Sequence, residues 1–340
     1  MYFVENNSPE EFPVNYIFGK LFAPLIKKIG ELDVRLRRIE SELESTRIAV
    51  VQSRIREFYQ IQTLDNLADA EFRVFSQWGE DGIIQYLISQ IPIPNKIFVE
   101  FGVENYRESN TRFLLVNDNW SGLVMDGDAN NIAQIRSMPL YWRHDIEAKT
   151  AFITAENINS LLQESGIHGD IGILSIDIDG NDYWVWKAIS EETISPRIVI
   201  IEYNSVFGKE CSITIPYTPD FQRSKAHFSN LYYGTSLKAF CRLAEEKGYK
   251  FVGSNSVGCN AFFVRSDVIG NLPVTDYVRG YQESKVREAR DETGKLMFLA
   301  GKKRLEMIGH LPIVDLESGE KTTIGRATAK TGEEGYGIAE

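Results

Sequence analysis

The stretch Tyr249-Lys-Phe-Val-Gly-Ser-Asn-Ser-Val-Gly-Cys-Asn-Ala-Phe-Phe-Val264 decides the fold. It holds two β-rich runs, 249–253 and 260–264, joined by a turn that contains Asn255 and Gly258. A connection this short has no room for a crossover helix, so the two strands must be antiparallel. The chain therefore closes its sheet with a hairpin.

Upstream of this hairpin, from about residue 75, short apolar runs alternate with helix-like segments. Such alternation is typical of βαβ units, which build a parallel sheet with helices on both faces. We expect an α/β fold in which five parallel strands precede the antiparallel hairpin. The expected parallel strands cover residues 96–102, 122–126, 140–143, 171–177 and 197–202.

The composition excludes several classes of protein. The chain has 340 residues, with 37 Lys and Arg against 48 Asp and Glu, a net charge of −11. A binder of duplex nucleic acid would instead be basic, so we expect no nucleic-acid partner. The three cysteines are widely spaced and offer neither a disulfide framework nor a zinc motif. There is no apolar run of the ~18 residues that predict a membrane span, and Glu5, Glu10 and Glu11 argue against a signal peptide, so we expect a cytoplasmic protein.

Residues 1–70 are predicted to form a separate helical extension. Apolar residues recur there at spacings of three and four, the a/d pattern of a short coiled coil, at Ile29, Leu32, Leu36, Ile39 and Leu43. We favour self-association through this helix, which would make a homo-oligomer. Two alternatives stay open: an amphipathic helix packed on its own domain, or peripheral contact with a membrane. The second rests on the nine basic and six acidic side chains of residues 20–57.

The rest of the chain divides into three parts in our prediction. The α/β domain covers residues 71–270, and a charged helical segment covers 271–318. A disordered tail covers 319–340, because this stretch has almost no large apolar side chains that could bury a core.

Acidic side chains follow five consecutive predicted strands. Because ligands of open parallel sheets bind beyond the carboxyl ends of the strands, these side chains mark a candidate site. A single acid at such a place is often only a helix cap or a turn residue, but five in succession are harder to explain in that way. The set is Glu100 with Gly102, Asp126 with Asp128, Asp145, Asp177 with Asp179 and Asp182, and Glu202 with Asn204.

The segment after the first predicted strand lies where a nucleotide-binding turn belongs, and Gly102 would let the backbone approach a ligand closely. The segment lacks the G-x-G-x-x-G spacing and the chain has no P-loop motif, so dinucleotide and P-loop interpretations are weak. Asp126 could accept the hydroxyls of a ribose. Asp145 could accept an adenine amine, or it could only cap the turn at Ile146.

Four segments together resemble the class I S-adenosylmethionine-dependent methyltransferases. They are Val99-Glu-Phe-Gly102, Leu123-Val-Met-Asp126, His144-Asp145 and Leu174-Ser-Ile-Asp-Ile-Asp-Gly-Asn-Asp-Tyr-Trp-Val-Trp186. Within that class the chain is most similar to the FkbM-type families, over about residues 75–265. The resemblance implies a Rossmann-like, seven-stranded methyltransferase sheet and S-adenosylmethionine as the cofactor.

The same resemblance implies roles for individual residues. Glu100 and Gly102 would lie along the methionine part of the cofactor, Asp126 would hold the ribose and Asp145 would lie near the adenine. The family's strand ending Asp-x-Glu-Gly corresponds to Asp177-Ile-Asp179-Gly180, and we include Asp177 among the cofactor-binding residues. One departure is Tyr106, which stands where the first motif usually has its third glycine.

The segment Asp177-Ile-Asp-Gly-Asn-Asp182 allows two functional interpretations. Mg²⁺ or Mn²⁺ could bind to Asp177, Asp179, Glu202 and Asn204, because hard cations prefer several oxygen ligands, and catechol-type methyltransferases are similar in this respect. Alternatively, Asp179 or Asp182 could act as the general base or orient the acceptor, because methylation of a hydroxyl requires removal of its proton. The plain alternative is an Asx turn that starts the next helix.

A long insertion, about residues 205–234, follows the fifth predicted strand. It is rich in aromatic residues and turn formers, so we expect an ordered lid that overhangs the carboxyl edge and shapes the acceptor pocket. His227 in this insertion is a further candidate for the catalytic base, and the alternative is a surface histidine.

Three functions from different classes follow from these observations. We favour an enzyme, an S-adenosylmethionine-dependent methyltransferase that acts on a hydroxyl of a small molecule or glycan. A metal-dependent glycosyltransferase is the alternative, because Asp126-Gly-Asp128 and Asp177-Ile-Asp179 are both Asp-x-Asp sequences. The third is a non-catalytic interaction protein in which the coiled coil matters more than the pocket.

Overall fold

The computed structural model describes residues 14–61 and 63–330, with side chains from residue 22 onward. The chain divides into two compact units, residues 1–52 and residues 53–340, and each is described by itself.

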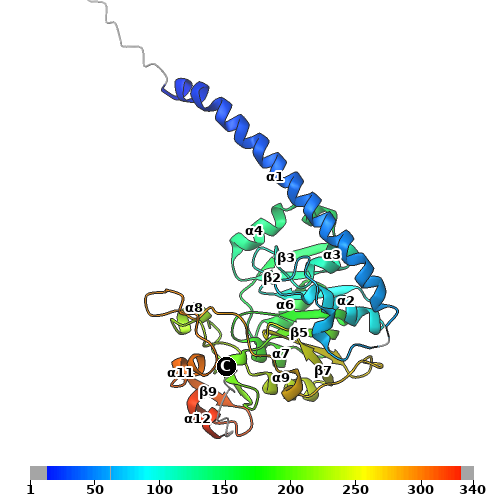
Figure 1. The fold of residues 1–340 in the computed structure, drawn as a ribbon, viewed down its shortest axis with the longest axis vertical. Helices are drawn as coiled ribbons and strands as arrows, with labels where there is room; N and C mark the ends of the chain where they lie inside the picture. The colour runs from blue at the N-terminus through cyan, green and yellow to red at the C-terminus, as the bar shows by residue number, and fades with distance from the viewer. Residues whose placement is uncertain (1–13, 62, 331–340) are drawn as a thin grey trace, which may run out of the picture. The chain divides into compact units, whose positions relative to one another are not determined.

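The described part of the first unit is helix α1, Val14–Phe58, whose last residues belong to the second unit (Figure 1). After Pro24 the helix is rich in Arg, Glu and Leu, which are strong helix formers. The predicted N-terminal helix is thus confirmed, whereas the coiled coil stays a prediction. Among the helices of the described residues, none combines the length and the apolar character needed to cross a membrane.

The second unit is built on a seven-stranded sheet in the order β3-β2-β1-β4-β5-β8-β7. Strands β1 to β5 are parallel, and β8 pairs antiparallel with both β5 and β7. This arrangement confirms the predicted Rossmann-like methyltransferase sheet with its closing hairpin. The strands are β1 Ile97–Phe101, β2 Ser121–Asp126, β3 Ile146–Thr150, β4 Gly169–Ile176, β5 Ile194–Glu202, β7 Tyr249–Ser254 and β8 Asn260–Arg265.

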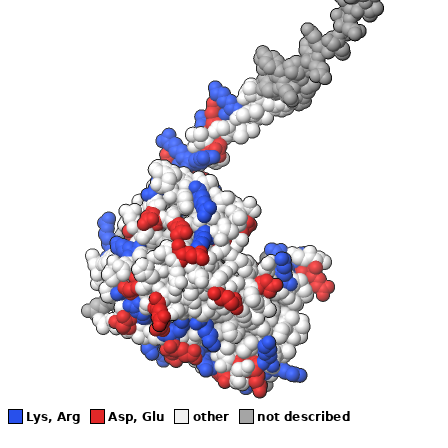
Figure 2. All heavy atoms as spheres, turned by 180° about the vertical axis from the view of Figure 1, so that it is seen from behind, with Lys and Arg blue, Asp and Glu red and all other residues white. Residues whose placement is uncertain are grey.

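Helices cover both faces of this sheet, because successive strand residues point alternately into two apolar cores. Phe98 of β1 lies in the core covered by α2, α3 and α4, and its neighbour Val99 lies in the core covered by α6, α7 and α9. These helices are α2 Glu80–Gln90, α3 Arg112–Asp118, α4 Ala129–Ser137, α6 Ile158–Glu164, α7 Asp182–Ala188 and α9 Leu237–Glu246. On the face drawn in Figure 2, acidic and basic side chains are interspersed over this unit.

A second, smaller sheet joins the insertion after β5 to the end of the described chain. Its strand order is β10-β9-β6, where β6 is Ile213–Thr214, β9 is Pro312–Asp315 and β10 is Lys321–Thr323. It has its own apolar core, to which Phe207, Ile308 and Ile324 contribute fully buried side chains. The short helices of this region are α8 Arg223–Ala226, α11 Lys302–Ile308 and α12 Ile324–Lys330.

The structure corrects the predicted third strand. Residues 139–143 form helix α5, Pro139–Arg143, because Pro139 occupies the first helical position, where its missing N–H costs nothing. The third strand is β3 instead, a sequence of mixed polarity at the edge of the sheet.

The C-terminal part also differs from the prediction. Residues 271–318 are helical only in α10, Tyr277–Gly280, and in α11. Between them the chain runs without regular structure and bonds to the segment that follows β5, for example through Ser284 N, which donates to Ser205 Oγ at 2.8 Å. Residues 321–330 of the predicted tail form β10 and α12, because Ile324 and Ala327 bury their side chains in the third core. Residues 331–340 lie outside the described residues.

Candidate active site

A cavity of about 680 Å³ opens at the carboxyl edge of the parallel strands. Residues at or just beyond the ends of all five parallel strands line it, as the sequence predicts. The insertion after β5 and the segment after α10 complete its wall, through residues such as Arg223 and Glu288. The cavity brings together these predicted site residues: Glu100, Gly102, Asp126, Asp177, Asp179 and Glu202.

Glu100 lines the cavity, but its carboxylate is committed to the loop between β1 and α3. It accepts hydrogen bonds from Ser109 Oγ at 2.6 Å, from Asn110 N at 2.8 Å and from Thr111 N at 3.0 Å. Burial raises the pKa of Glu100, and these hydrogen bonds only partly oppose that rise. The side chain therefore shapes the loop that borders the cavity.

Gly102 is required by the neighbouring strand. Its φ is +70°, and a Cβ atom at this position would lie 1.6 Å from the backbone oxygen of Asp177. Only glycine lets the end of β1 approach the end of β4 so closely. The close approach that the sequence predicts is thus made to another strand of the protein.

Tyr106 replaces the expected glycine without closing the cavity. Its φ of +60° is the left-handed conformation that glycine adopts readily. The ring is fully buried in the core under α2 and α3, and its hydroxyl shares a hydrogen bond of 2.9 Å with Thr111 Oγ1. The Tyr106 side chain, which departs from the family's motif, is therefore accommodated in the protein interior.

Asp126 ends β2 and reaches the cavity, where the sequence predicts a ribose-binding acid. Its Oδ1 accepts from Asp128 N at 2.8 Å and from Asn131 Nδ2 at 3.1 Å, and its Oδ2 accepts from Glu104 N at 2.8 Å. A carboxylate has about four acceptor positions, so three are in use and one remains on Oδ2. The side chain can still receive one hydroxyl of a ligand.

Asp145 does not line this cavity, so its predicted place near an adenine is not supported. It precedes β3, so it lies at the amino end of that strand, and its side chain is exposed. The carboxyl end of β3 instead contributes Ala151, Phe152 and Ile153 to the cavity. The error follows from the misplaced third strand.

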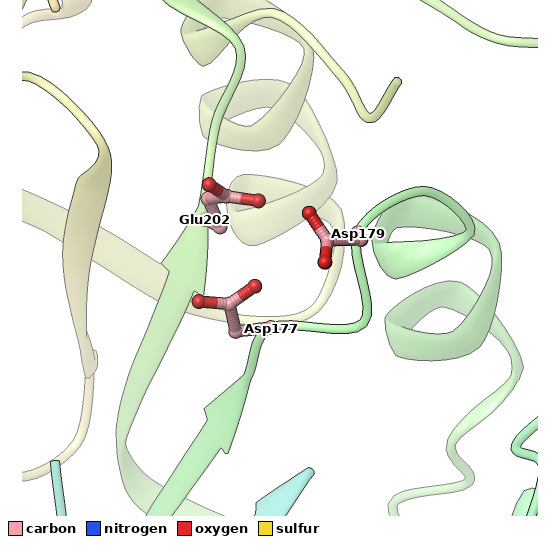
Figure 3. A group of neighbouring side chains, drawn as sticks. All are labelled: Asp177, Asp179 and Glu202. Atoms are coloured by element: carbon pink, nitrogen blue, oxygen red, sulfur yellow. The ribbon is translucent and has the colours of Figure 1, made fainter. Parts of the chain in front are cut away.

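Three carboxyl groups converge at the ends of β4 and β5. Asp177 follows β4, Asp179 lies in the next loop and Glu202 ends β5, and the groups point toward one another (Figure 3). One oxygen from each lies within 4.8 Å of the others. Burial, and then the like charges nearby, raise the pKa of Asp177 and of Glu202 well above the usual carboxyl range. The pair therefore retains a proton at pH values where an exposed carboxyl has lost it.

Two other predicted site residues, Asp182 and Asn204, have side chains that hydrogen-bond to backbone groups. Asp182 accepts from Ile178 N at 2.9 Å and from Gly180 N at 2.8 Å, so it holds the turn that starts α7, as in the plain alternative. Asn204 Nδ2 donates to the carbonyls of Leu231 and Tyr233 at 2.9 Å each, which ties the insertion to the end of β5. Neither residue lines the cavity. The prediction of Asp182 as base and of Asn204 as metal ligand is therefore not supported.

Arg223 is the site residue that the sequence analysis missed. Its Nη1 lies 2.6 Å from Asp179 Oδ1, and its Nη2 pairs with Glu288. Its guanidinium carbon lies 3.7 Å from the ring centroid of Tyr233, a cation–π contact. The acids at this edge indicate that a cation should lie nearby, but no local pattern in the sequence singles out Arg223 among the basic residues of the insertion.

His227 is not part of the cavity wall. Its Nδ1 shares a hydrogen bond of 2.7 Å with Ser229 Oγ, and its ring packs against Phe228 and His310. Burial, and then the nearby His310, lower the pKa of His227. The predicted lid is ordered and lines the cavity, but it contributes an arginine and a tyrosine there, Arg223 and Tyr233, and not this histidine.

Comparisons with known proteins gave structural likenesses only. No family model matches the chain, and no curated protein matches it. Among solved structures, the chain is similar to the N-terminal domain of EvdMO1 with SAH bound, with a TM-score of 0.37 and 11% identity over 64% of this chain and 95% of that one. It is also similar to the citrinin polyketide synthase CMeT domain, with a TM-score of 0.36 and 12% identity over 55% of this chain and 51% of that one.

A third likeness is to an S-adenosylmethionine-dependent methyltransferase from Clostridium acetobutylicum, with a TM-score of 0.32 and 7% identity over 51% of this chain and 85% of that one. All three TM-scores are low. The assignment of the fold therefore rests on the strand order and pairing of this chain.

Proposed function

We propose that the chain is an S-adenosylmethionine-dependent methyltransferase that methylates a hydroxyl of a small molecule or glycan. The observation that carries this proposal is the position of the cavity. It lies beyond the carboxyl ends of β1, β2 and β4, in a sheet of the methyltransferase order, with Asp126 at its wall. The finer resemblance to the FkbM-type families stays a prediction.

The residues around β1 and β2 fit this cofactor. Asp126 Oδ2 has acceptor capacity for one ribose hydroxyl, and Met125, Phe152 and Ile153 offer apolar surface beside it. Glu100 and Gly102 set the shape of the neighbouring loop and of the strand ends. When bound, S-adenosylmethionine supplies an electrophilic methyl group, and the protein's task is to position an acceptor oxygen in line with it.

The acceptor would enter on the side of Asp177, Asp179 and Glu202. Carboxylates accept hydrogen bonds from hydroxyl groups, and Arg223 and the Tyr233 hydroxyl, which lies 3.5 Å from Glu202 Oε1, border the same wall, so a polyhydroxylated acceptor suits it. Within the described residues Glu202 Oε2 is buried and has no hydrogen-bond partner. We assign Glu202 as the group that takes the proton which the acceptor hydroxyl loses. Asp179, paired with Arg223, would orient the acceptor.

The three carboxylates could also hold Mg²⁺ or Mn²⁺, since they offer three oxygens from two adjacent strand ends. The fourth predicted ligand, Asn204, is used by the insertion, and the Arg223 guanidinium already lies against Asp179. A metal at this place would have to displace or share the carboxylate with that cation. The arrangement therefore favours transfer without a metal.

The glycosyltransferase alternative depends on two Asp-x-Asp sequences. In the second, Asp177 and Asp179 line the cavity, but the Arg223 guanidinium already pairs with Asp179. The first is the acidic pair Asp126 and Asp128. Asp128 accepts from Asn130 N at 2.8 Å as the N-cap of α4 and does not line the cavity, so the two acids do not converge. This observation favours the methyltransferase.

Calorimetry on the full chain tests the proposal. We expect S-adenosylhomocysteine to bind, and UDP- or GDP-sugars with Mn²⁺ not to bind. Binding of a nucleotide sugar with Mn²⁺ and not of S-adenosylhomocysteine would favour the glycosyltransferase. No binding of either would leave the non-catalytic interaction protein.

A further inference from the structure

Helix α1 carries an apolar stripe that faces solvent in the single chain. Six successive a and d residues, Leu25, Ile29, Leu32, Leu36, Ile39 and Leu43, have exposed fractions between 50% and 59%. The same spacing of three and four extends to Phe22 on one side and, through Thr46, to Val50 on the other. This stripe covers about four heptads, some 40 Å of helix at 1.5 Å per residue.

We propose that this stripe packs against the same stripe of a second copy of this chain, with the two helices parallel and in register. The proposal is independent of the methyltransferase function. The charges that flank the stripe favour a second copy over other partners.

In a parallel, in-register pair each g residue of one helix faces the e residue five positions later in the other. The stripe has three such pairings: Lys28 with Asp33, Arg35 with Glu40, and Glu42 with Arg47. All three join opposite charges. A helix that served another apolar partner would have no need of this self-complementary order.

Antiparallel pairing of the same stripe is less favourable. With the centre between Leu36 and Ile39, Asp33 of one helix faces Glu40 of the other, and only Arg35 with Glu42 joins opposite charges. With the centre moved to residue 34, Arg35 faces its own copy and Asp33 does the same. Each antiparallel arrangement therefore brings like charges together, which is unfavourable.

The ion pairs within the single helix are compatible with this arrangement. Asp33 pairs with Arg37, and Glu42 pairs with Arg38, both at 2.8 Å. These arginines occupy b and c positions, away from the seam. Among the residues with described side chains, Lys28, Arg35 and Glu40 form no ion pair within the chain, so their charges are available to a second copy.

Disulfide trapping of the full chain tests the direction and the register. Ile29→Cys places a thiol at an a position, which in a parallel pair faces the same residue of the second copy at a distance that a disulfide can bridge. Val34→Cys, at the outer f position, is the matched control. On mild oxidation we expect the Ile29→Cys chain to form covalent dimers at least tenfold faster than the Val34→Cys chain. Equal rates, or an Ile29→Cys chain that stays uncrosslinked, would overturn the parallel register.

Charge reversal gives a second test, by sedimentation equilibrium. Glu42→Lys or Arg47→Glu alone puts like charges across the seam, and we expect either to weaken self-association by about 3- to 10-fold. The double variant restores opposite charges only between copies, since residues 42 and 47 are not neighbours on one helix. Recovery in the double variant supports the proposal. A monomeric wild-type chain, or one that binds vesicles of anionic lipid as a monomer, would refute it.

Discussion

Arg223 Nη1 lies 2.6 Å from Asp179 Oδ1, so the most exposed of the three converging carboxyl groups is paired with a guanidinium. Arg223 comes from the insertion after β5, and Asp179 comes from the loop after β4. This ion pair joins the overhanging wall of the cavity to the sheet below it. It also supplies, from within the chain, the positive charge that a divalent ion would otherwise bring.

Removal of that guanidinium should create a metal site. In Arg223→Met the three carboxylates lose the nearest cation, and we expect their affinity for Mn²⁺, measured by electron paramagnetic resonance, to rise at least tenfold, about 1.4 kcal/mol. Lys225→Met removes a charge from the same short helix, away from the cavity, and should leave the affinity unchanged. Tight Mn²⁺ binding by the wild-type chain, with no gain in Arg223→Met, would restore the metal-dependent interpretation.

The rate of methyl transfer should decrease as pH is lowered, and the midpoint of this decrease should lie above the pKa of an ordinary carboxyl group. A base acts only when deprotonated, and burial raises the pKa of Glu202, so activity should be lost as pH decreases through that raised pKa. Arg223 opposes the rise, so Arg223→Gln should move the limb to higher pH. Glu202→Gln should lower turnover by about 10² to 10⁴ while S-adenosylhomocysteine still binds normally. Unchanged turnover in Glu202→Gln would exclude Glu202 as the base.

Cofactor affinity should depend on Asp126 and not on its neighbour Asp128. Asp126→Asn removes a charge-assisted hydrogen bond, so calorimetry should show S-adenosylhomocysteine binding weakened by about 1.5–3 kcal/mol. Asp128→Asn loses the same charge two residues later, and Asn caps a helix as well as Asp does, so its affinity should equal that of the wild type. Equal affinities in the two variants would remove Asp126 from the cofactor site.

The free energy of unfolding should depend on pH through the titration of Asp182. Burial raises the pKa of Asp182 to about 6, against about 3.9 in an unfolded chain. The folded state therefore holds a proton that the unfolded state has released, and stability is lost as pH increases from about 4 through 6. Urea unfolding at several pH values should show that Asp182→Asn, which cannot titrate, lacks a decrease of about 2–3 kcal/mol over this window. Parallel curves for wild type and variant would contradict this assignment.

The sheet was predictable from the sequence because its signals are local. Alternating apolar runs give parallel strands, and the short turn around Asn255 leaves only an antiparallel hairpin. The third strand was the exception. The aromatic residues at 141 and 142 favoured a strand there, whereas the edge strand β3 is polar and gives a weaker strand signal. That single shift moved Asp145 from one end of a strand to the other, which is why the predicted adenine contact finds no support in the structure.

The candidate site was predictable only in part. The position of a residue along a strand indicates which edge of the sheet it lies at, but it does not indicate which groups its side chain hydrogen-bonds to. Asp177, Asp179 and Glu202 converge as expected, but Asp182 and Asn204 lie equally close in sequence and turn to backbone partners. Arg223 was out of reach for another reason. Its place depends on how the insertion folds back, which is determined by strands and buried residues about a hundred positions further along the chain.

Strand β6 of the insertion pairs with β9, through Ile213 with Asp315 and Thr214 with Val314, and Tyr232 Oη donates to the carbonyl of Pro312. The wall that presents Arg223 is therefore supported by residues that are synthesised after the whole seven-stranded sheet. A nascent chain that has left the ribosome only as far as residue 270 can complete the sheet, but it still lacks this support. During synthesis the seven-stranded sheet can therefore form first. The wall that presents Arg223 is completed only when the last described strands emerge.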